Sequence, residues 1–323
     1  MLILTGATGF LGRAVVTELH DQPLKALCRT PAPDLETRGV AVAIGSLLDR
    51  AWVESQISAG DTVVHMAGKV EFTASGIREM HSLHVEATRV VAGVAAARGA
   101  RLILLSSSGT TAISRHDRPV DERASYPMEL VSKWPYYLSK TLQERLVLDM
   151  ASREQLDAVV LNPSLLLGPG DERVGSTSVV RDFLASKIPT VPPGGISVVD
   201  VRDTAAAVRS SLTRGKPGER YFLAGHNCRF STFFRVLEAI SGVRAPYITI
   251  PGRIATLGAR AVHRLKDGAV PHPAMIEMAN YFWYADSQKA ARELGFAPRP
   301  LEATLRDTIA YLRDRAPDRT KYA

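Results

Sequence analysis

Cysteine is almost absent from this chain: Cys28 and Cys228 are the only two among 323 residues, and they lie far apart. The sequence contains no CxxC pair and no Cys/His cluster, which excludes a disulfide-stabilised scaffold and a zinc site. We therefore expect no bound metal and a protein of the reducing cytoplasm.

Long hydrophobic runs and long basic runs are also missing. No apolar segment approaches the roughly 18 residues of a membrane-spanning helix, and the chain enters an apolar strand at Leu2, so we expect neither a membrane span nor a signal peptide. The 40 Lys and Arg residues are interleaved with 33 Asp and Glu residues, which leaves a net charge of +7. This pattern argues against a nucleic-acid partner and is typical of a solvated surface that also attracts anionic cofactors. The partner that we expect is a small-molecule substrate.

The first dozen residues carry the strongest motif. An apolar run, Leu2-Ile3-Leu4, is followed by a GxxGxxG pattern and then by apolar residues at helical spacing, which predicts a strand, a glycine turn and a helix. The start of such a helix binds phosphate through free backbone N–H groups and its positive dipole end. The alternative is a glycine-rich turn without a ligand. The predicted cofactor contacts here are Gly6, Thr8, Gly9, Phe10, Leu11 and Gly12.

Apolar strands alternate with helices through the first half of the chain. The pattern predicts strands at 24–28, 40–44, 62–66, 101–106 and 158–162, and helices at 78–98 and 136–152. This alternation indicates an α/β fold with a parallel, doubly wound Rossmann sheet that binds ligands at the C-terminal ends of its strands. We expect residues 1–163 and 204–225 to form this domain. Residues 164–203 and 226–323 would form a smaller, mostly helical substrate domain with a short strand at 247–250.

Tyr136 and Lys140 are four residues apart in a predicted helix, so they share one face. An ammonium beside a phenol lowers the pKa of the phenol, and a tyrosine tuned in this way can transfer a proton near neutral pH. The alternative is an ordinary surface pair. Beside the glycine loop, we favour a catalytic pair.

Three serines end the fifth predicted strand, where hydroxyl groups would face the cofactor crevice. We expect Ser108 to orient a substrate carbonyl or hydroxyl, with Ser107 as the close alternative because a shift of one residue exchanges them. Ser106 is a predicted cofactor contact. The alternative is that these serines only cap the strand.

Together, the glycine motif, the serine after the fifth strand and the Tyr-xxx-Lys pair resemble the extended short-chain dehydrogenase/reductase superfamily. Dihydroflavonol-reductase-like and hydroxysteroid-dehydrogenase-like members, including the hopanoid-associated epimerase-like group, resemble the chain most. The resemblance implies that Tyr136 is the acid/base and that Lys140 binds the nicotinamide ribose and tunes Tyr136. It also implies a possible homodimer. Two positions depart from the family pattern: Ser46-Leu47 replaces a frequent Asp-Leu pair, and His84 replaces a usual asparagine, where we expect a structural histidine.

The end of the second strand selects the cofactor. An acidic residue there binds the ribose of NAD, whereas an arginine accommodates the 2′-phosphate of NADP. This chain has Arg29 and Thr30 there and no acid, which predicts NADP(H), with NAD(H) as the alternative if Arg29 only stacks on adenine. The other predicted cofactor contacts are Ser46, Leu47, Met66, Ala67, Gly68, Asn162, Pro163 and Ser164.

We therefore predict an NADP(H)-dependent oxidoreductase that interconverts a ketone and a secondary alcohol. One alternative is a nucleotide-sugar epimerase or dehydratase that retains NAD and binds its diphosphate through basic residues of the small domain. A less favoured alternative is a non-catalytic NADP sensor. The basic residues that would bind the diphosphate in the epimerase alternative are Arg253, Arg260, His263 and Arg264. The small domain also contains an aromatic run that could form either a substrate wall or core: Tyr281, Phe282, Trp283 and Tyr284.

Overall fold

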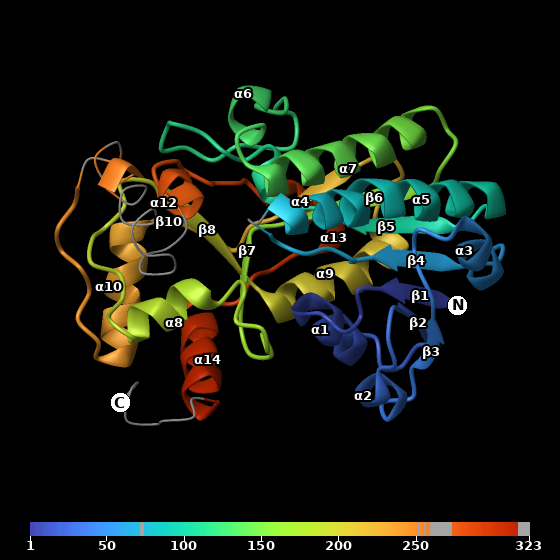
Figure 1. Cartoon of the computed structure of the whole chain (residues 1–323), viewed down its shortest axis with the longest axis horizontal. Helices are drawn as coiled ribbons and strands as arrows, with labels where there is room; N and C mark the ends of the chain where they lie inside the picture. Colours follow the sequence, from blue (N-terminus) through green and yellow to red (C-terminus); the bar gives the residue numbers. More distant parts are fainter. Residues whose placement is uncertain (72–73, 251, 253, 255, 259–272, 316–323) are drawn as a thin grey trace.

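A seven-stranded parallel sheet forms the centre of the molecule in this computed structural model, which describes residues 1–71, 74–250, 252, 254, 256–258 and 273–315 (Figure 1). The strand order is β3-β2-β1-β4-β5-β6-β9, so the winding direction reverses between β1 and β4. This topology confirms the predicted doubly wound sheet. The strands are β1 (Leu2–Thr5), β2 (Leu24–Cys28), β3 (Ala41–Ile44), β4 (Thr62–His65), β5 (Arg101–Leu105), β6 (Ala158–Pro163) and β9 (Arg220–Leu223).

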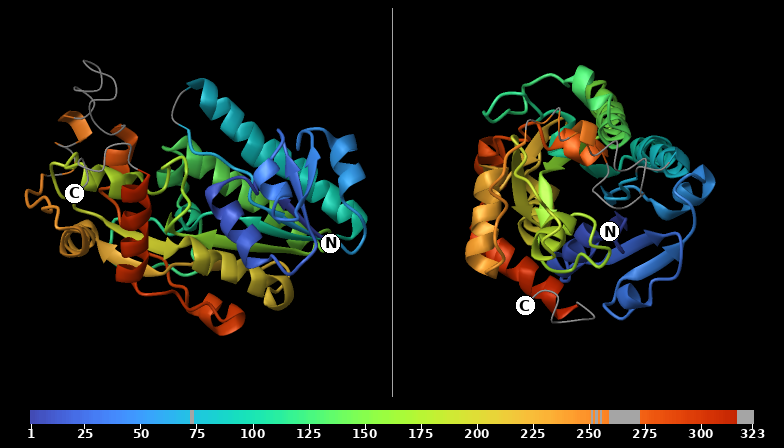
Figure 2. Two further views of the ribbon diagram at one scale, coloured as in Figure 1. Left: turned by 90° about the horizontal axis from the view of Figure 1, so that it is seen from below. Right: turned by 60° about the vertical axis from the view of Figure 1, so that its left-hand side comes forward.

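Helices cover both faces of this sheet, as Figures 1 and 2 show from three sides. Because both faces are covered, the strands are apolar along most of their length, and β6 is buried at every position. On one face lie α3 (Arg50–Gln56), α5 (Ala87–Arg98) and α7 (Pro135–Ser152). On the other face lie α1 (Phe10–Glu18), α9 (Val201–Arg214) and α13 (Gln288–Leu294).

The predicted long helix at 78–98 has a break in its hydrogen-bonding pattern. It consists of α4 (Ala74–His81), a π-helical turn at Ser82–Glu86 and α5. A π turn inserts an extra residue and is often found at functional sites; here it carries the buried His84. The helix ends as predicted at Gly99, which takes the left-handed conformation (φ 61°) that glycine adopts without strain.

A second, three-stranded sheet continues from the C-terminal end of β6 and was not predicted. Its order is β10-β8-β7, with β7 (Leu165–Leu167) beginning two residues after β6. The strands are short, and β10 contains only one apolar side chain, so the sequence pattern is weak. The other two strands are β8 (Gly195–Asp200) and β10 (His226–Arg229), and the helices nearby are α8 (Ser178–Leu184), α10 (Phe230–Ser241), α12 (Pro273–Met278) and α14 (Leu301–Asp314).

The strand predicted at 247–250 is wrong. This segment forms only a single bridge, between Thr249 and Val191, and Tyr247 is largely exposed. Its alternating apolar residues resemble a strand, but within the described part of the chain only Val191 pairs with it, so no ladder forms. The boundaries proposed for the two domains stay a prediction. Two short helices complete the described elements: α2 (Pro33–Glu36) and α6 (Met128–Val131).

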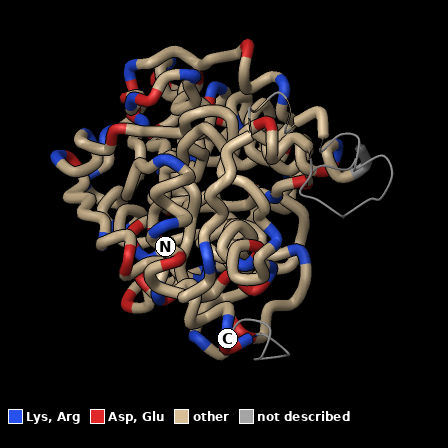
Figure 3. The backbone as a smooth tube through the Cα atoms, turned by 90° about the vertical axis from the view of Figure 1, so that its left-hand side faces the viewer, with Lys and Arg blue, Asp and Glu red and all other residues tan. Residues whose placement is uncertain are grey.

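Lys and Arg positions and Asp and Glu positions alternate along the backbone, as the colours of the tube in Figure 3 show. Among the described residues, no helix is both long enough and apolar enough to span a membrane. The same residues contain no group of three or more His, Cys, Asp or Glu side chains arranged to hold a metal ion.

Candidate active site

The predicted site residues gather along one edge of the main sheet. All of its strands are parallel, so their C-terminal ends lie at the same edge, and the reversal of order between β1 and β4 opens a crevice there. The glycine loop follows β1, and Met66, Ala67 and Gly68 follow β4. The remaining predicted contacts lie after β2 (Arg29, Thr30), after β3 (Ser46, Leu47), after β5 (Ser106, Ser108) and at the end of β6 (Asn162, Pro163, Ser164).

The glycine loop forms a cradle at the start of α1. Gly6 has φ +72°, and a side chain there would come within 2.8 Å of the backbone of Met66 and Ala67. A side chain at Gly12 would meet the Gly6 carbonyl oxygen at 2.2 Å, so this glycine allows the helix to pack on the loop. At Gly9, the N-cap of α1, an added Cβ would contact only the Gly6 oxygen at 3.3 Å.

No side chain caps the start of α1, and its first turn contains no acidic residue. Its backbone N–H groups are therefore available to an anion. Two buried atoms at the C-terminal end of β6, Asn162 Oδ1 within the strand and Ser164 Oγ just after it, also have no hydrogen-bond partner among the described residues. The open face of Gly9 and these unpartnered atoms fit a dinucleotide in the crevice.

Of the three serines after β5, Ser107 is the one that meets Tyr136. The Ser107 and Tyr136 hydroxyl groups are hydrogen-bonded, a contact that lowers the pKa of Tyr136, and Ser107 Oγ accepts a second hydrogen bond from the Gly109 N–H at 3.2 Å. Ser108 is buried in a short 3₁₀ turn that begins at that residue. The structure therefore brings the alternative serine, rather than Ser108, to the tyrosine, while Ser106 turns its hydroxyl away to Glu144.

Tyr136 lies at the start of α7 in partly buried, mostly apolar surroundings. Burial raises the pKa of Tyr136 to about 12, and the hydrogen bond with Ser107 acts in the opposite direction. The Tyr137 ring lies 5.0 Å from the Tyr136 ring, and the His84 ring lies 5.8 Å away, both in edge-on contact. In this arrangement the phenol is neutral, and the lowering of its pKa by Lys140 stays a prediction.

Lys140 is buried one helical turn after Tyr136 and has only neutral hydrogen-bond acceptors. Its Nζ donates to the Leu105 carbonyl oxygen at 2.7 Å and to Gln143 Oε1. Burial lowers the pKa of Lys140 to about 7, while the negative charge of Glu144 opposes that shift. A lysine with this pKa changes its charge within the physiological range, which is typical of functional sites.

A chain of neutral groups connects Lys140 to the glycine loop. Because Lys140 donates to the Gln143 oxygen, the amide nitrogen of Gln143 points at Thr88 Oγ1, 2.7 Å away. Thr88 Oγ1 lies 2.8 Å from His65 Nε2, and His65 Nδ1 lies 2.7 Å from Thr5 Oγ1. Burial and the nearby Lys140 charge lower the pKa of His65 to about 3, so its ring stays neutral. His65 therefore connects Thr88 to Thr5 as a neutral group.

His84 connects three segments of the site. Its Nδ1 lies 2.8 Å from Ser139 Oγ on α7, and its Nε2 accepts a hydrogen bond from the Lys69 N–H at 3.2 Å. Burial, and then the charge of Lys140, lower the pKa of His84 to about 2. A neutral ring with both nitrogens occupied positions the π turn against α7, which agrees with the expected structural role.

Comparison with known proteins identifies the chain's relatives. Residues 2–224 match the model of the NAD dependent epimerase/dehydratase family. The chain belongs to this family. It is an NAD(P)-dependent oxidoreductase of the extended short-chain dehydrogenase/reductase type, as the glycine, serine and tyrosine–lysine motifs predict.

Individual relatives cover almost the whole chain. A protein of Methylococcus capsulatus named sterol demethylase protein B is 28% identical, with 97% of this chain and 98% of the relative aligned. A putative dihydroflavonol 4-reductase of Synechocystis is 27% identical, over 96% of this chain and 94% of the relative. The crystal structure of gox2253 is 27% identical, with a TM-score of 0.84 and 98% of each chain covered.

Glu144 is a buried member of the site that the sequence analysis missed. Its carboxylate accepts hydrogen bonds from four neutral groups and pairs with Arg220 at 3.2 Å. It lies one turn after Lys140 on α7, and this i,i+4 spacing was the available signal. It joins the segment after β5, the end of β6 and the start of β9 to α7. The four donors are Ser106 (2.5 Å), Thr110 (3.0 Å), Tyr126 (3.1 Å) and Asn162 (2.7 Å).

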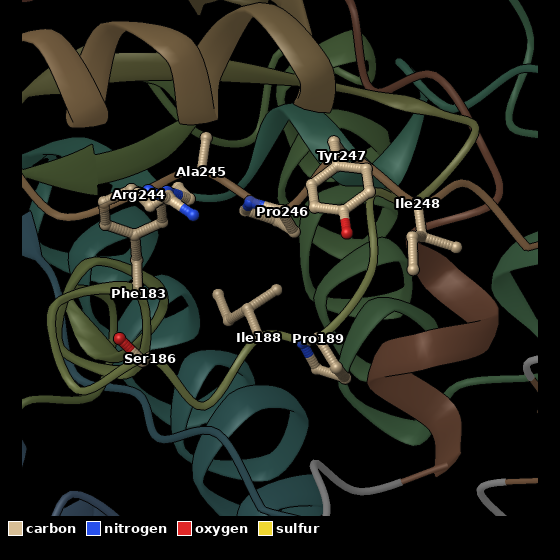
Figure 4. Close-up of a pocket in the computed structure, with 9 residues that line it drawn as sticks. All are labelled: Phe183, Ser186, Ile188, Pro189, Arg244, Ala245, Pro246, Tyr247 and Ile248. Carbon is tan, nitrogen blue, oxygen red and sulfur yellow. The ribbon is translucent and has the colours of Figure 1, made fainter.

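A pocket lies apart from these residues, between α8 and the segment at 244–248 (Figure 4). None of its lining residues is a predicted site residue, so it is not the family's cofactor crevice. The basic residues on which the nucleotide-sugar alternative rests, Arg253, Arg260, His263 and Arg264, lie outside the described residues. The pocket is lined by Phe183, Ser186, Ile188, Pro189, Arg244, Ala245, Pro246, Tyr247 and Ile248.

Proposed function

We propose that this protein is an NADP(H)-dependent oxidoreductase that interconverts a ketone and a secondary alcohol, with Tyr136 as the acid/base. The observation that carries the proposal is the hydrogen bond between Ser107 and Tyr136, at the edge of the sheet where the glycine cradle lies. A serine and a tyrosine hydroxyl side by side can hold one carbonyl oxygen between them. Reductases among the relatives support the same reaction class.

When bound, the nicotinamide would supply or accept the hydride. The chain's own residues would do the rest. Ser107 would orient the substrate oxygen and Tyr136 would give its proton to that oxygen, or take one in the reverse direction. Lys140 would contribute positive charge to the ribose side of the site, and the glycine cradle would hold the pyrophosphate.

Aromatic side chains beside Tyr136 favour an apolar substrate. Tyr137 and Trp283 lie with ring centroids 4.7 Å apart, and Trp134 lies 5.8 Å from Trp283 and 5.5 Å from Tyr281. Tyr281 and Trp283 are partly buried and pack with Tyr137 against the buried Trp134, and Tyr284 is buried, so only part of the aromatic run at 281–284 would face a substrate. Aromatic side chains of this kind bind ring-bearing organic substrates through their faces and edges.

The nucleotide-sugar epimerase or dehydratase stays the second candidate, because the family to which the chain belongs includes those activities by name. It would retain its dinucleotide through the reaction cycle, whereas a reductase must exchange it. Copurification of firmly held NAD, without consumption of NADPH by any ketone, would favour this candidate. A homodimer and a cytoplasmic location remain part of the proposal.

The test is turnover of NADPH with a panel of apolar ketones by the wild-type protein and by Tyr136→Phe. The variant keeps the ring and loses the titrating hydroxyl, so we expect turnover to fall by about 100-fold or more while cofactor affinity is unchanged. Tyr137→Phe is the matched control, since Tyr137 contacts Trp283 rather than Ser107 and should stay active. Near-normal turnover by Tyr136→Phe would reject the assignment.

A further inference from the structure

Two cations from different strand ends converge on one carboxylate at the edge of the sheet. Arg29 follows β2 and Lys69 follows the end of β4, and these strands flank β1 on either side. Glu79 on α4 accepts from both: its Oε1 lies 3.1 Å from Arg29 Nη1 and its Oε2 lies 2.7 Å from Lys69 Nζ. Each oxygen of the carboxylate therefore holds one cation.

This cluster lies at the surface. The exposed fraction of the side chain is 71% for Arg29, 53% for Glu79 and 27% for Lys69. Exposed ion pairs add little to folding stability, because solvent screens them and ordering long side chains opposes them. The arrangement therefore leaves Arg29 and Lys69 with readily exchanged partners, at the strand end that selects between NAD and NADP.

A phosphate monoester fits this arrangement better than a carboxylate does. It carries a charge of about −1.5 to −2 near neutral pH and three acceptor oxygens, whereas the Glu79 carboxylate carries −1 and two oxygens. A guanidinium can grip two phosphate oxygens at once, and an ammonium can take the third.

We propose that Glu79 is an internal competitor for the 2′-phosphate of NADP(H): it pairs with Arg29 and Lys69 until the phosphate displaces it, and Lys69 is the second phosphate-binding cation. This inference rests on the NADP(H) preference of the proposed function. The strength of Glu79's competition then sets how strongly the protein discriminates NADP(H) from NAD(H). Lys69 follows the predicted contact Gly68 directly, and its backbone N–H is held by His84, so its position is fixed at the crevice.

The test is the affinity for NADPH and NADH, and for 2′-AMP and 5′-AMP, measured by calorimetry at fixed ionic strength. Glu79→Gln removes the competing charge and should raise the affinity for NADPH and 2′-AMP about three- to tenfold, with NADH and 5′-AMP unchanged. Lys69→Met should lower the affinity for NADPH about tenfold and leave NADH unchanged. Asp149→Asn is the control, because Asp149 forms a similarly exposed pair with Arg153 at the other end of α7.

Other affinities in these variants would overturn the proposal or assign Glu79 and Lys69 to another part of the cofactor. Unchanged or weaker NADPH binding by Glu79→Gln would overturn the proposal, and a loss of NADH binding alone would assign Glu79 to the ribose. An equal loss of both cofactors in Lys69→Met would place Lys69 on the shared pyrophosphate and overturn its role. These are binding measurements, so they stand apart from the turnover test of Tyr136. If the wild-type protein bound both cofactors equally, the NADP(H) preference would fail, while a gain in Glu79→Gln would still support the competition.

Discussion

The two ends of the crevice hold a glutamate each, and the two glutamates differ in almost every respect. Glu144, at the chemical end, is fully buried, and it is surrounded by hydroxyl and amide donors and one guanidinium. Glu79, at the end where the adenosine would lie, is half exposed and meets only two cations. Hydrogen bonds from Lys69 and then from Arg29 hold the pKa of Glu79 below its usual range, so it is charged at every pH at which the protein would work.

The two lysines of the crevice show the same contrast. Lys140 has lost its water and has no carboxylate in direct contact, so its pKa is close to 7. Lys69 keeps part of its water and lies beside two carboxylates, Glu79 at 2.7 Å and Glu71 at 3.8 Å. A buried group without a charged partner in direct contact has a shifted pKa, which suits proton transfer. An exposed ion pair exchanges its partners easily, which suits the recognition of an anion. The comparison predicts that variants at the chemical end disturb stability and turnover, while variants at the other end disturb only cofactor choice.

The largest effect should follow from Glu144→Gln. Removing one partner of a buried pair leaves an uncompensated charge on Arg220, whose side chain is only 11% exposed, and such losses amount to about 3–5 kcal/mol of unfolding free energy. Urea denaturation measures it. Glu79→Gln makes the same chemical change at the other end and should leave the denaturation midpoint unchanged. Equal midpoints for both variants would break the comparison.

Gly9→Val should come next, with a loss of cofactor affinity of about 100-fold. The added side chain would occupy the open face of the cradle, where the pyrophosphate must approach the backbone. Within the protein the added Cβ would meet a single atom, the Gly6 oxygen at 3.3 Å, so a shift of a few tenths of an ångström accommodates it. Fluorescence titration with NADPH and NADH measures the loss.

Gly12→Ala is the control for that experiment. Its Cβ would meet the Gly6 oxygen at 2.2 Å and the Ala7 backbone at 2.6 Å, so we expect a lower melting temperature. Unchanged cofactor affinity in a folded Gly9→Val protein would show that the nucleotide is not held at this loop.

The sequence predicted those features whose residues are close together in the chain, and it missed those whose residues come from distant segments. The parallel sheet was predictable because each strand is an apolar run next to a helix, and the glycine loop because its residues are consecutive. Glu144 was missed because its five partners come from β6, from β9 and from the segment between β5 and α6, and no sequence spacing connects them. Which of Ser107 and Ser108 lies beside Tyr136 depends on a shift of one residue, and the 3₁₀ turn that begins at Ser108 has no clear signal in the sequence.

Arg29→Ala tests the end of the crevice where the adenosine would lie, and we expect a smaller loss of affinity than for Gly9→Val. A charge-assisted contact to a phosphate contributes about 1.5–3 kcal/mol, which corresponds to about one to two decades of affinity. We expect that loss for NADPH and a much smaller one for NADH, because NADH has no 2′-phosphate. Stability and the turnover number at saturating NADPH should stay close to those of the wild-type protein. Calorimetric titration with both cofactors measures the difference, and equal losses would mean that Arg29 stacks on the adenine that both share.

The last effect is absent at neutral pH and appears only in acid, and it tests the burial of His84. Burial lowers the pKa of His84 from 6.5 to about 2, so the folded protein keeps the ring neutral while the unfolded chain takes up a proton below pH 6.5. A group whose folded pKa is depressed favours the unfolded state as the pH falls, by about 1.4 kcal/mol per pH unit below the unfolded value. His84→Asn removes this proton uptake, so its unfolding free energy should fall less steeply between pH 6 and pH 4.5. Denaturation curves across that range measure the slope, and His116→Asn, at an exposed position, should behave as the wild-type protein does. If His84→Asn instead kept the full wild-type slope, the ring would already be protonated in the folded protein, and the neutral connection from Lys69 through His84 to Ser139 would have to be abandoned.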